Sequence, residues 1–129
     1  LLIEDNEQNR YLTTFLLERH DYSVVAAIDG HRDLELAQTI SPTIILLDIQ
    51  LPTMDGYAVA RALRKIQNLR DTPIVAVTSY AMAGDQEKAV AAGCDGYIEK
   101  PINPDTFVSE IEQFLPGPEP AIRSHVKNV

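Results

Sequence analysis

Three carboxylates, one hydroxyl and one ammonium group each follow a short stretch of the sequence that has the character of a β-strand. The stretches are residues 1–3, 43–47, 74–77 and 96–99, and the groups that follow them are Glu4 with Asp5, Asp48, Thr78 and Lys100. If these stretches form parallel strands of one sheet, their carboxyl ends lie side by side, and open α/β sheets bind ligands at that edge. Such a set of groups suits a divalent cation with oxygen ligands together with a phosphoryl group.

The charges of this set predict a bound cation. Two carboxylates about 4 Å apart repel by roughly 4 kcal/mol at an effective dielectric constant near 20, so Glu4, Asp5 and Asp48 cannot all stay ionised in one pocket unaided. Lys100 supplies one positive charge, and Mg²⁺ supplies two and prefers oxygen ligands. Taken singly, each residue is more typical of a turn, a strand end or a solvated surface, and only their joint placement favours a site. We therefore predict Mg²⁺ as a cofactor.

The elements that would position these groups alternate between strand and helix five times. Besides the four strands above, residues 23–27 have the character of a strand. Helices are predicted after the capping residue Asn6, over residues 30–40, after Gly56, over residues 84–92 with Gly93 as the stop signal, and after the capping residue Asn103. This alternation predicts an α/β fold, a doubly wound parallel sheet of five strands with helices on both faces.

The composition is that of one globular domain with an acidic surface. The 129 residues have room for one core, which we assign to residues 1–115, whereas residues 116–129 carry three prolines and are predicted to be a tail or linker. The 11 Lys and Arg residues against 19 Asp and Glu residues give a net charge of -8, which repels nucleic acid phosphates. Cys94 is the single cysteine, and no apolar stretch approaches the length of a membrane span. We expect a cytoplasmic location without nucleic acid binding or membrane insertion.

Four motifs resemble the signature of two-component response-regulator receiver domains. They are Glu4-Asp5-Asn6, the segment from Asp48 to Gly56, Val77-Thr78-Ser79 and Tyr97-Ile98-Glu99-Lys100-Pro101. The resemblance extends from residue 1 to residue 115, with the motifs in order and at fitting spacings. Within the family, the chain is most similar to single-domain regulators and to the receivers of hybrid sensor kinases. The resemblance implies a CheY-like, flavodoxin-like fold with strand order 2-1-3-4-5.

The resemblance also implies a role for each predicted site residue. Asp48 would be the phosphoacceptor, taking a phosphoryl group from a phosphohistidine of a sensor histidine kinase or a histidine phosphotransfer protein. Asp5, Asp48 and the backbone carbonyl of Gln50 would ligate Mg²⁺ directly, and Glu4 would act mainly through water. Lys100 would pair with the phosphoryl oxygens. The chain would then be a signalling switch and not an enzyme, although it would support its own phosphorylation and slow dephosphorylation.

A switch of this kind needs a route from the phosphoryl group to a partner, and the resemblance implies one. Thr78 would donate its hydroxyl to the phosphoryl group, and the ring of Tyr97 would turn inward when Thr78 moves. The surface of the fourth helix, fifth strand and fifth helix would change and bind a downstream protein. A cis peptide bond between Lys100 and Pro101 is also implied.

Other functions compete with this interpretation. A phosphatase of the haloacid-dehalogenase type also uses Asp, Mg²⁺ and Lys at a sheet edge, but it needs an Asp-x-Asp pair where this chain has Asp48-Ile49-Gln50. A flavodoxin-like cofactor binder needs a phosphate loop after the first strand, and the acidic residues 4–7 would repel a phosphate there. A receiver segment cut from a hybrid sensor kinase is the third alternative. The motifs favour a receiver over the phosphatase and the cofactor binder.

Overall fold

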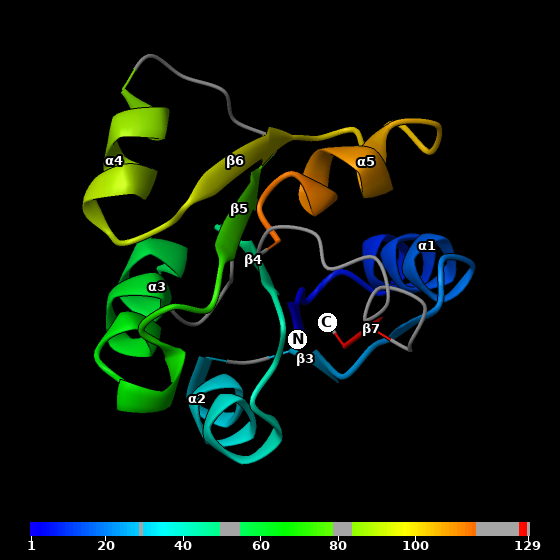
Figure 1. The fold of residues 1–129 in the computed structure, drawn as a ribbon. Helices are drawn as coiled ribbons and strands as arrows, with labels where there is room; N and C mark the ends of the chain where they lie inside the picture. The colour runs from blue at the N-terminus through cyan, green and yellow to red at the C-terminus, as the bar shows by residue number, and fades with distance from the viewer. Residues whose placement is uncertain (29, 50–54, 79–83, 116–126, 129) are drawn as a thin grey trace.

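The computed structural model describes residues 1–28, 30–49, 55–78, 84–115 and 127–128, and its centre is a five-stranded parallel sheet (Figure 1). The strands lie in the order β3-β1-β4-β5-β6. Their bounds are β1 (Leu2–Ile3), β3 (Ala26–Ala27), β4 (Ile45–Asp48), β5 (Ile74–Thr78) and β6 (Gly96–Glu99). All four pairings are parallel, so the predicted α/β fold with a five-stranded parallel sheet is confirmed.

The second predicted strand differs in detail from the expectation. Residues 23–27 do not form one strand, because only β3 joins the main sheet, with Leu2 of β1 opposite Ala26. In that register Tyr22 and Ser23 lie before the first residue of β1. They form the short strand β2 (Tyr22–Ser23), which pairs in parallel with β7 (Lys127–Asn128). Within the predicted tail, residues 116–126 and 129 lie outside the described residues.

Helices cover both faces of the sheet. They are α1 (Glu7–Glu18), α2 (Gly30–Ile40), α3 (Gly56–Arg64), α4 (Asp85–Ala91) and α5 (Phe107–Glu112), with a short 3₁₀ helix η1 (Gln67–Leu69) after α3. Among the described residues, none of the helices combines the length and apolar character that a membrane crossing requires.

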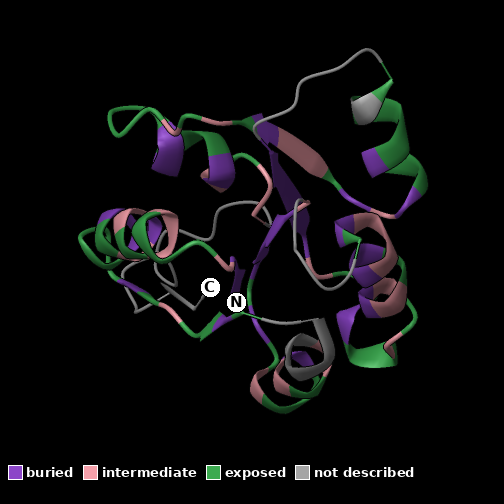
Figure 2. Cartoon of the chain, turned by 180° about the vertical axis from the view of Figure 1, so that it is seen from behind, coloured by how far each residue is buried: buried purple, intermediate pink, exposed green. Residues whose placement is uncertain are grey.

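Two separate apolar clusters explain why both faces are covered. Successive side chains of a strand point to opposite faces, and in β4 the side chains of Ile45 and Leu47 join one cluster whereas Leu46 joins the other. The first cluster includes residues of α2, α3 and α4, and the second includes residues of α1 and α5. The buried strands therefore run through the middle of the molecule, and the helices expose their outer surfaces (Figure 2). This is the doubly wound arrangement that the sequence predicts.

Local signals define several helix ends. The side chain of Asn6 caps α1 by accepting a hydrogen bond from the Asn9 amide at 2.9 Å, and Gly93 follows α4 at a φ of 101°. The last helix is the exception, because it begins at Phe107 and not directly after Asn103. The side-chain oxygen of Asn103 accepts from the Asp105 amide at 3.0 Å, and this bond holds a turn over residues 104–106 before the helix.

Candidate acidic site at the strand ends

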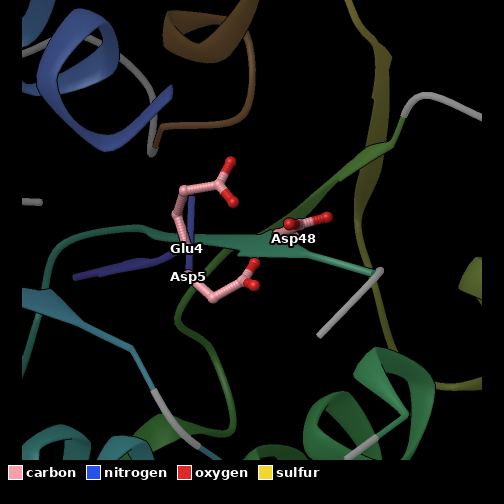
Figure 3. Close-up of side chains that lie close together, drawn as sticks. All are labelled: Glu4, Asp5 and Asp48. Atoms are coloured by element: carbon pink, nitrogen blue, oxygen red, sulfur yellow. The ribbon is translucent and has the colours of Figure 1, made fainter. Parts of the chain in front are cut away.

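The structure brings the three predicted carboxylates together at one edge of the sheet. Glu4 and Asp5 follow β1, and Asp48 ends the neighbouring strand β4 (Figure 3). One oxygen atom from each side chain lies within 4.8 Å of the others. Glu4 and Asp48 are buried, and Asp5 is the more exposed of the three. Three carboxylate oxygens at this spacing form a candidate site for an oxygen-ligated cation.

Lys100 reaches the same cluster from the end of β6. Its Nζ donates to Oε1 of Glu4 at 2.8 Å and lies 3.5 Å from Oδ2 of Asp48. The Lys100 amide donates to the Thr78 carbonyl at 2.7 Å, which extends the β5 to β6 pairing by one residue and directs the side chain to this edge. The peptide bond between Lys100 and Pro101 is cis, as expected. One ammonium therefore contacts two of the three carboxylates, and the cluster keeps an excess of negative charge.

The pKa of Glu4 reflects its burial first and the neighbouring Asp48 carboxylate second. Burial in the site is the largest cause that raises the pKa of this carboxyl group from its ordinary value to about 7, and the hydrogen bond with Asp48 raises it further. The Lys100 ammonium opposes this shift but does not cancel it. In the absence of a metal, the cluster therefore holds a carboxyl group that ionises only partly near neutral pH.

The two residues of the predicted switch lie on neighbouring strands. Thr78 ends β5 opposite Glu99 and is buried, and Tyr97 of β6 lies opposite Ala76. The half-buried Tyr97 packs against the apolar cluster under α2, α3 and α4. Gln50, the predicted backbone ligand, lies outside the described residues.

The structure also identifies a glycine next to the site whose importance the sequence did not reveal. Gly56 opens α3, and a Cβ atom at this position would collide with Cα of Ile49 and lie 2.9 Å from the Asp48 carbonyl oxygen. The N-terminus of α3 therefore packs directly on the backbone that follows Asp48. The sequence predicts that Gly56 precedes a helix and ends the motif that begins at Asp48, but it does not predict this packing, because a contact between backbones has no side-chain pattern.

Comparisons with known proteins agree with the fold. The family model for the response regulator receiver domain matches residues 1–112. The polar-differentiation response regulator DivK of Brucella ovis is 39% identical over 115 residues, which cover 89% of this chain and 94% of DivK. Chemotaxis protein CheY4 of Vibrio cholerae has a similar structure, with a TM-score of 0.85, 27% identity, and coverage of 88% of this chain and 95% of CheY4.

Another similar structure contains a magnesium ion. It is the receiver domain of a sensor histidine kinase from Pseudomonas aeruginosa with a magnesium ion coordinated in its active-site cleft. The TM-score is 0.80 and the identity is 32%, over 88% of this chain and 93% of that one. The family match covers the five strands of the main sheet and every described residue of the acidic cluster, so it leaves no reason to prefer the phosphatase or flavodoxin-like alternative. The chain belongs to the response regulator receiver domain family, whose members act as phosphorylation-dependent signalling switches of two-component systems.

Proposed function

We propose that Asp48 is the residue that accepts the phosphoryl group, with a phosphohistidine of a sensor histidine kinase or a histidine phosphotransfer protein as the donor. The observation that supports this most is the position of Asp48 within the cluster. It lies at the end of a strand, within 4.8 Å of both acidic neighbours and 3.5 Å from the Lys100 ammonium. Asp48 therefore combines a metal-binding neighbourhood with a cation suited to phosphoryl oxygens, and Glu4, which shares both, is already engaged by Lys100 at the shorter distance of 2.8 Å.

The residues present fit Mg²⁺. Asp5 and Asp48 would hold the ion directly, and Glu4 would act through a water molecule, because Mg²⁺ keeps several waters and takes one or two protein carboxylates. The backbone carbonyl of Gln50 is the third predicted ligand. When bound, Mg²⁺ would offset the negative charge of the carboxylates and would orient a phosphoryl oxygen.

The transfer itself needs little covalent chemistry from the protein. An oxygen of the Asp48 carboxylate attacks phosphorus, an O–P bond forms, and the N–P bond to the donor histidine breaks with its electron pair left on nitrogen. Lys100 then pairs with a phosphoryl oxygen in place of part of its contact with Glu4. The Thr78 hydroxyl donates to another oxygen. Slow hydrolysis of the acyl phosphate by water would end the signal.

We propose that Thr78 and Tyr97 carry the signal to the surface of α4, β6 and α5, where a downstream protein binds. Support comes from the adjacency of their strands, since β5 and β6 pair over four residues between the phosphoacceptor edge and that surface. A partner shifts this equilibrium only by its different affinity for the two states. NMR of the phosphorylated protein should show shift changes within residues 84–115, and changes confined to the acidic cluster would refute this route.

We also propose that the protein is cytoplasmic and that it binds a protein and not nucleic acid. A cytoplasmic location is supported by the buried free thiol of Cys94, which is typical of a reducing compartment. The acidic net charge of -8 supports a protein partner over nucleic acid.

Intact-mass measurement tests the phosphoacceptor assignment. The protein is incubated with Mg²⁺ and a small acyl-phosphate donor, and it should gain the mass of one phosphoryl group. Asp48→Asn should abolish the gain, because an amide cannot form the acyl phosphate. Asp5→Asn keeps the acceptor but weakens the metal site, so it should slow the gain and shift it to higher Mg²⁺ concentration. An unchanged gain in Asp48→Asn would place the phosphoacceptor elsewhere.

A further inference from the structure

Arg10 connects α1 to the two acidic residues that follow β1. Its Nη1 donates to the carbonyl oxygen of Glu4 at 3.1 Å and to that of Asp5 at 3.0 Å. The guanidinium therefore reaches back along the chain by six and five residues, past the start of its own helix. It contacts the backbone of both residues whose side chains form the candidate site with Asp48.

The helix itself does not bind these two carbonyl groups. The first hydrogen bonds at the start of α1 go to Asn6, because the Asn9 amide donates to the Asn6 side chain at 2.9 Å and the Arg10 amide donates to the Asn6 carbonyl at 2.9 Å. The carbonyls of Glu4 and Asp5 precede this cap, so the helical ladder begins after them. The Asn6 amide donates to Oε2 of Glu4 at 3.3 Å, and the Arg10 side chain supplies the donor to the two backbone carbonyls of this turn.

We propose that Arg10 is a positioning residue of the magnesium site, an inference that rests on the proposed function of Asp5 and Asp48. Mg²⁺ demands nearly ideal octahedral geometry, so its affinity depends on how well the ligands are held in place. By fixing the backbone of Glu4 and Asp5, Arg10 keeps both carboxylates aimed at the oxygen atoms of Asp48. Residues that orient metal ligands typically change metal affinity by about 10- to 100-fold when they are replaced.

Replacement of Arg10 should change the Mg²⁺ affinity in opposite directions if Arg10 acts by positioning and if it acts only through its charge. Arg10 is a cation next to a site for a cation, so its charge alone repels the metal, and removal of that charge alone would strengthen metal binding. Positioning predicts the opposite, because an unrestrained turn weakens binding. Ca²⁺ tolerates irregular geometry and longer distances, so a loss of positioning should reduce its affinity less than that of Mg²⁺.

Calorimetric titration of the metal-free protein with Mg²⁺ and with Ca²⁺ tests the proposal. Arg10→Met keeps the aliphatic stem and should bind Mg²⁺ about 10-fold more weakly or worse, with a smaller loss for Ca²⁺. Arg10→Lys keeps the charge and an N–H donor group, so it should bind Mg²⁺ more tightly than Arg10→Met and less tightly than the wild type. Arg19→Met is the matched control, since Arg19 is exposed beyond the end of α1, over the Phe15 ring, and its removal changes the net charge equally.

A measurement without metal completes the test. In the presence of a chelator, hydrogen exchange of the Asn6 and Asn9 amides should be faster in Arg10→Met than in the wild type and unchanged in Arg19→Met. Equal or tighter Mg²⁺ binding by a folded Arg10→Met protein would overturn the proposal, as would unchanged exchange. If the wild type itself bound no Mg²⁺, the proposed metal site would be wrong, and the exchange measurement would still decide whether Arg10 restrains the turn.

Discussion

Replacement of Arg64 by methionine is expected to lower the free energy of unfolding by about 3 kcal/mol. This arginine is the last residue of α3, and its guanidinium lies at the edge of the sheet opposite the acidic cluster. It donates to the carbonyl oxygens of Leu69 at 2.9 Å, Thr72 at 2.8 Å and Gly93 at 2.7 Å. It also forms an ion pair with Asp95 at 2.8 Å. One side chain thus joins α3, the chain leading to β5 and the chain leading to β6.

The magnitude follows from the burial of each contact. The three carbonyl groups are partly buried, and a bond to a charged donor contributes about 1.5 to 3 kcal/mol when it is fully formed. Each contributes less here, about 1 kcal/mol, because Nη1 shares its two N–H groups among the carbonyls of Leu69, Thr72 and Arg70. The ion pair adds little, about 0 to 1 kcal/mol, because half of the Asp95 side chain is exposed to solvent. Methionine preserves the packing of the aliphatic stem, so the decrease in the free energy of unfolding is due mainly to the lost hydrogen bonds. Arg64→Lys should recover less than half of the lost free energy of unfolding, because a single ammonium group cannot reach all three carbonyl oxygens as the planar guanidinium does.

Urea unfolding followed by circular dichroism measures this loss. With a slope of about 1 to 3 kcal/mol per molar urea, the midpoint should fall by roughly 1 to 3 M. Arg61→Met is the control, because Arg61 is an exposed residue on the same helix and should change the stability by less than about 0.5 kcal/mol. If Arg64→Met and Arg61→Met unfolded at the same urea concentration, the hydrogen bonds of Arg64 would not stabilise the fold as argued.

Two further predictions concern single sites. Gly56→Ala should lower the stability by about 1 to 3 kcal/mol and slow phosphorylation, because the new Cβ meets backbone atoms that cannot move without displacing Asp48, the proposed phosphoacceptor. Wild-type stability together with a wild-type rate of mass gain would contradict this. Burial raises the pKa of the Cys94 thiol from its ordinary 9.0 to about 11, so alkylation by iodoacetamide at pH 8 should be about 100-fold slower in the native protein than in urea. Equal rates would show that the thiol is accessible and acidic.

The sequence alone was enough to predict the fold and the identity of the acidic residues. Strands and helices follow from the period of apolar residues, and helix ends follow from signals such as the cap at Asn6 and the glycine at position 93, which act on neighbours within one turn. Parallel strands place their carboxyl ends at one edge, so the joint position of Glu4, Asp5 and Asp48 was a consequence of the predicted sheet.

Only the tertiary structure decided how these groups are paired and supported. Lys100 is 96 residues from Glu4 in the sequence, and nothing local indicates that its shorter contact, at 2.8 Å, is with Glu4 and not with Asp48 at 3.5 Å. The close approach of Gly56 to the backbone after Asp48 likewise depends on how α3 packs against the sheet. Such contacts depend on distances between elements that are separate in the chain. Residue type and spacing carry the signals for local structure, whereas the contacts that tune a buried charge are set only when the elements pack together.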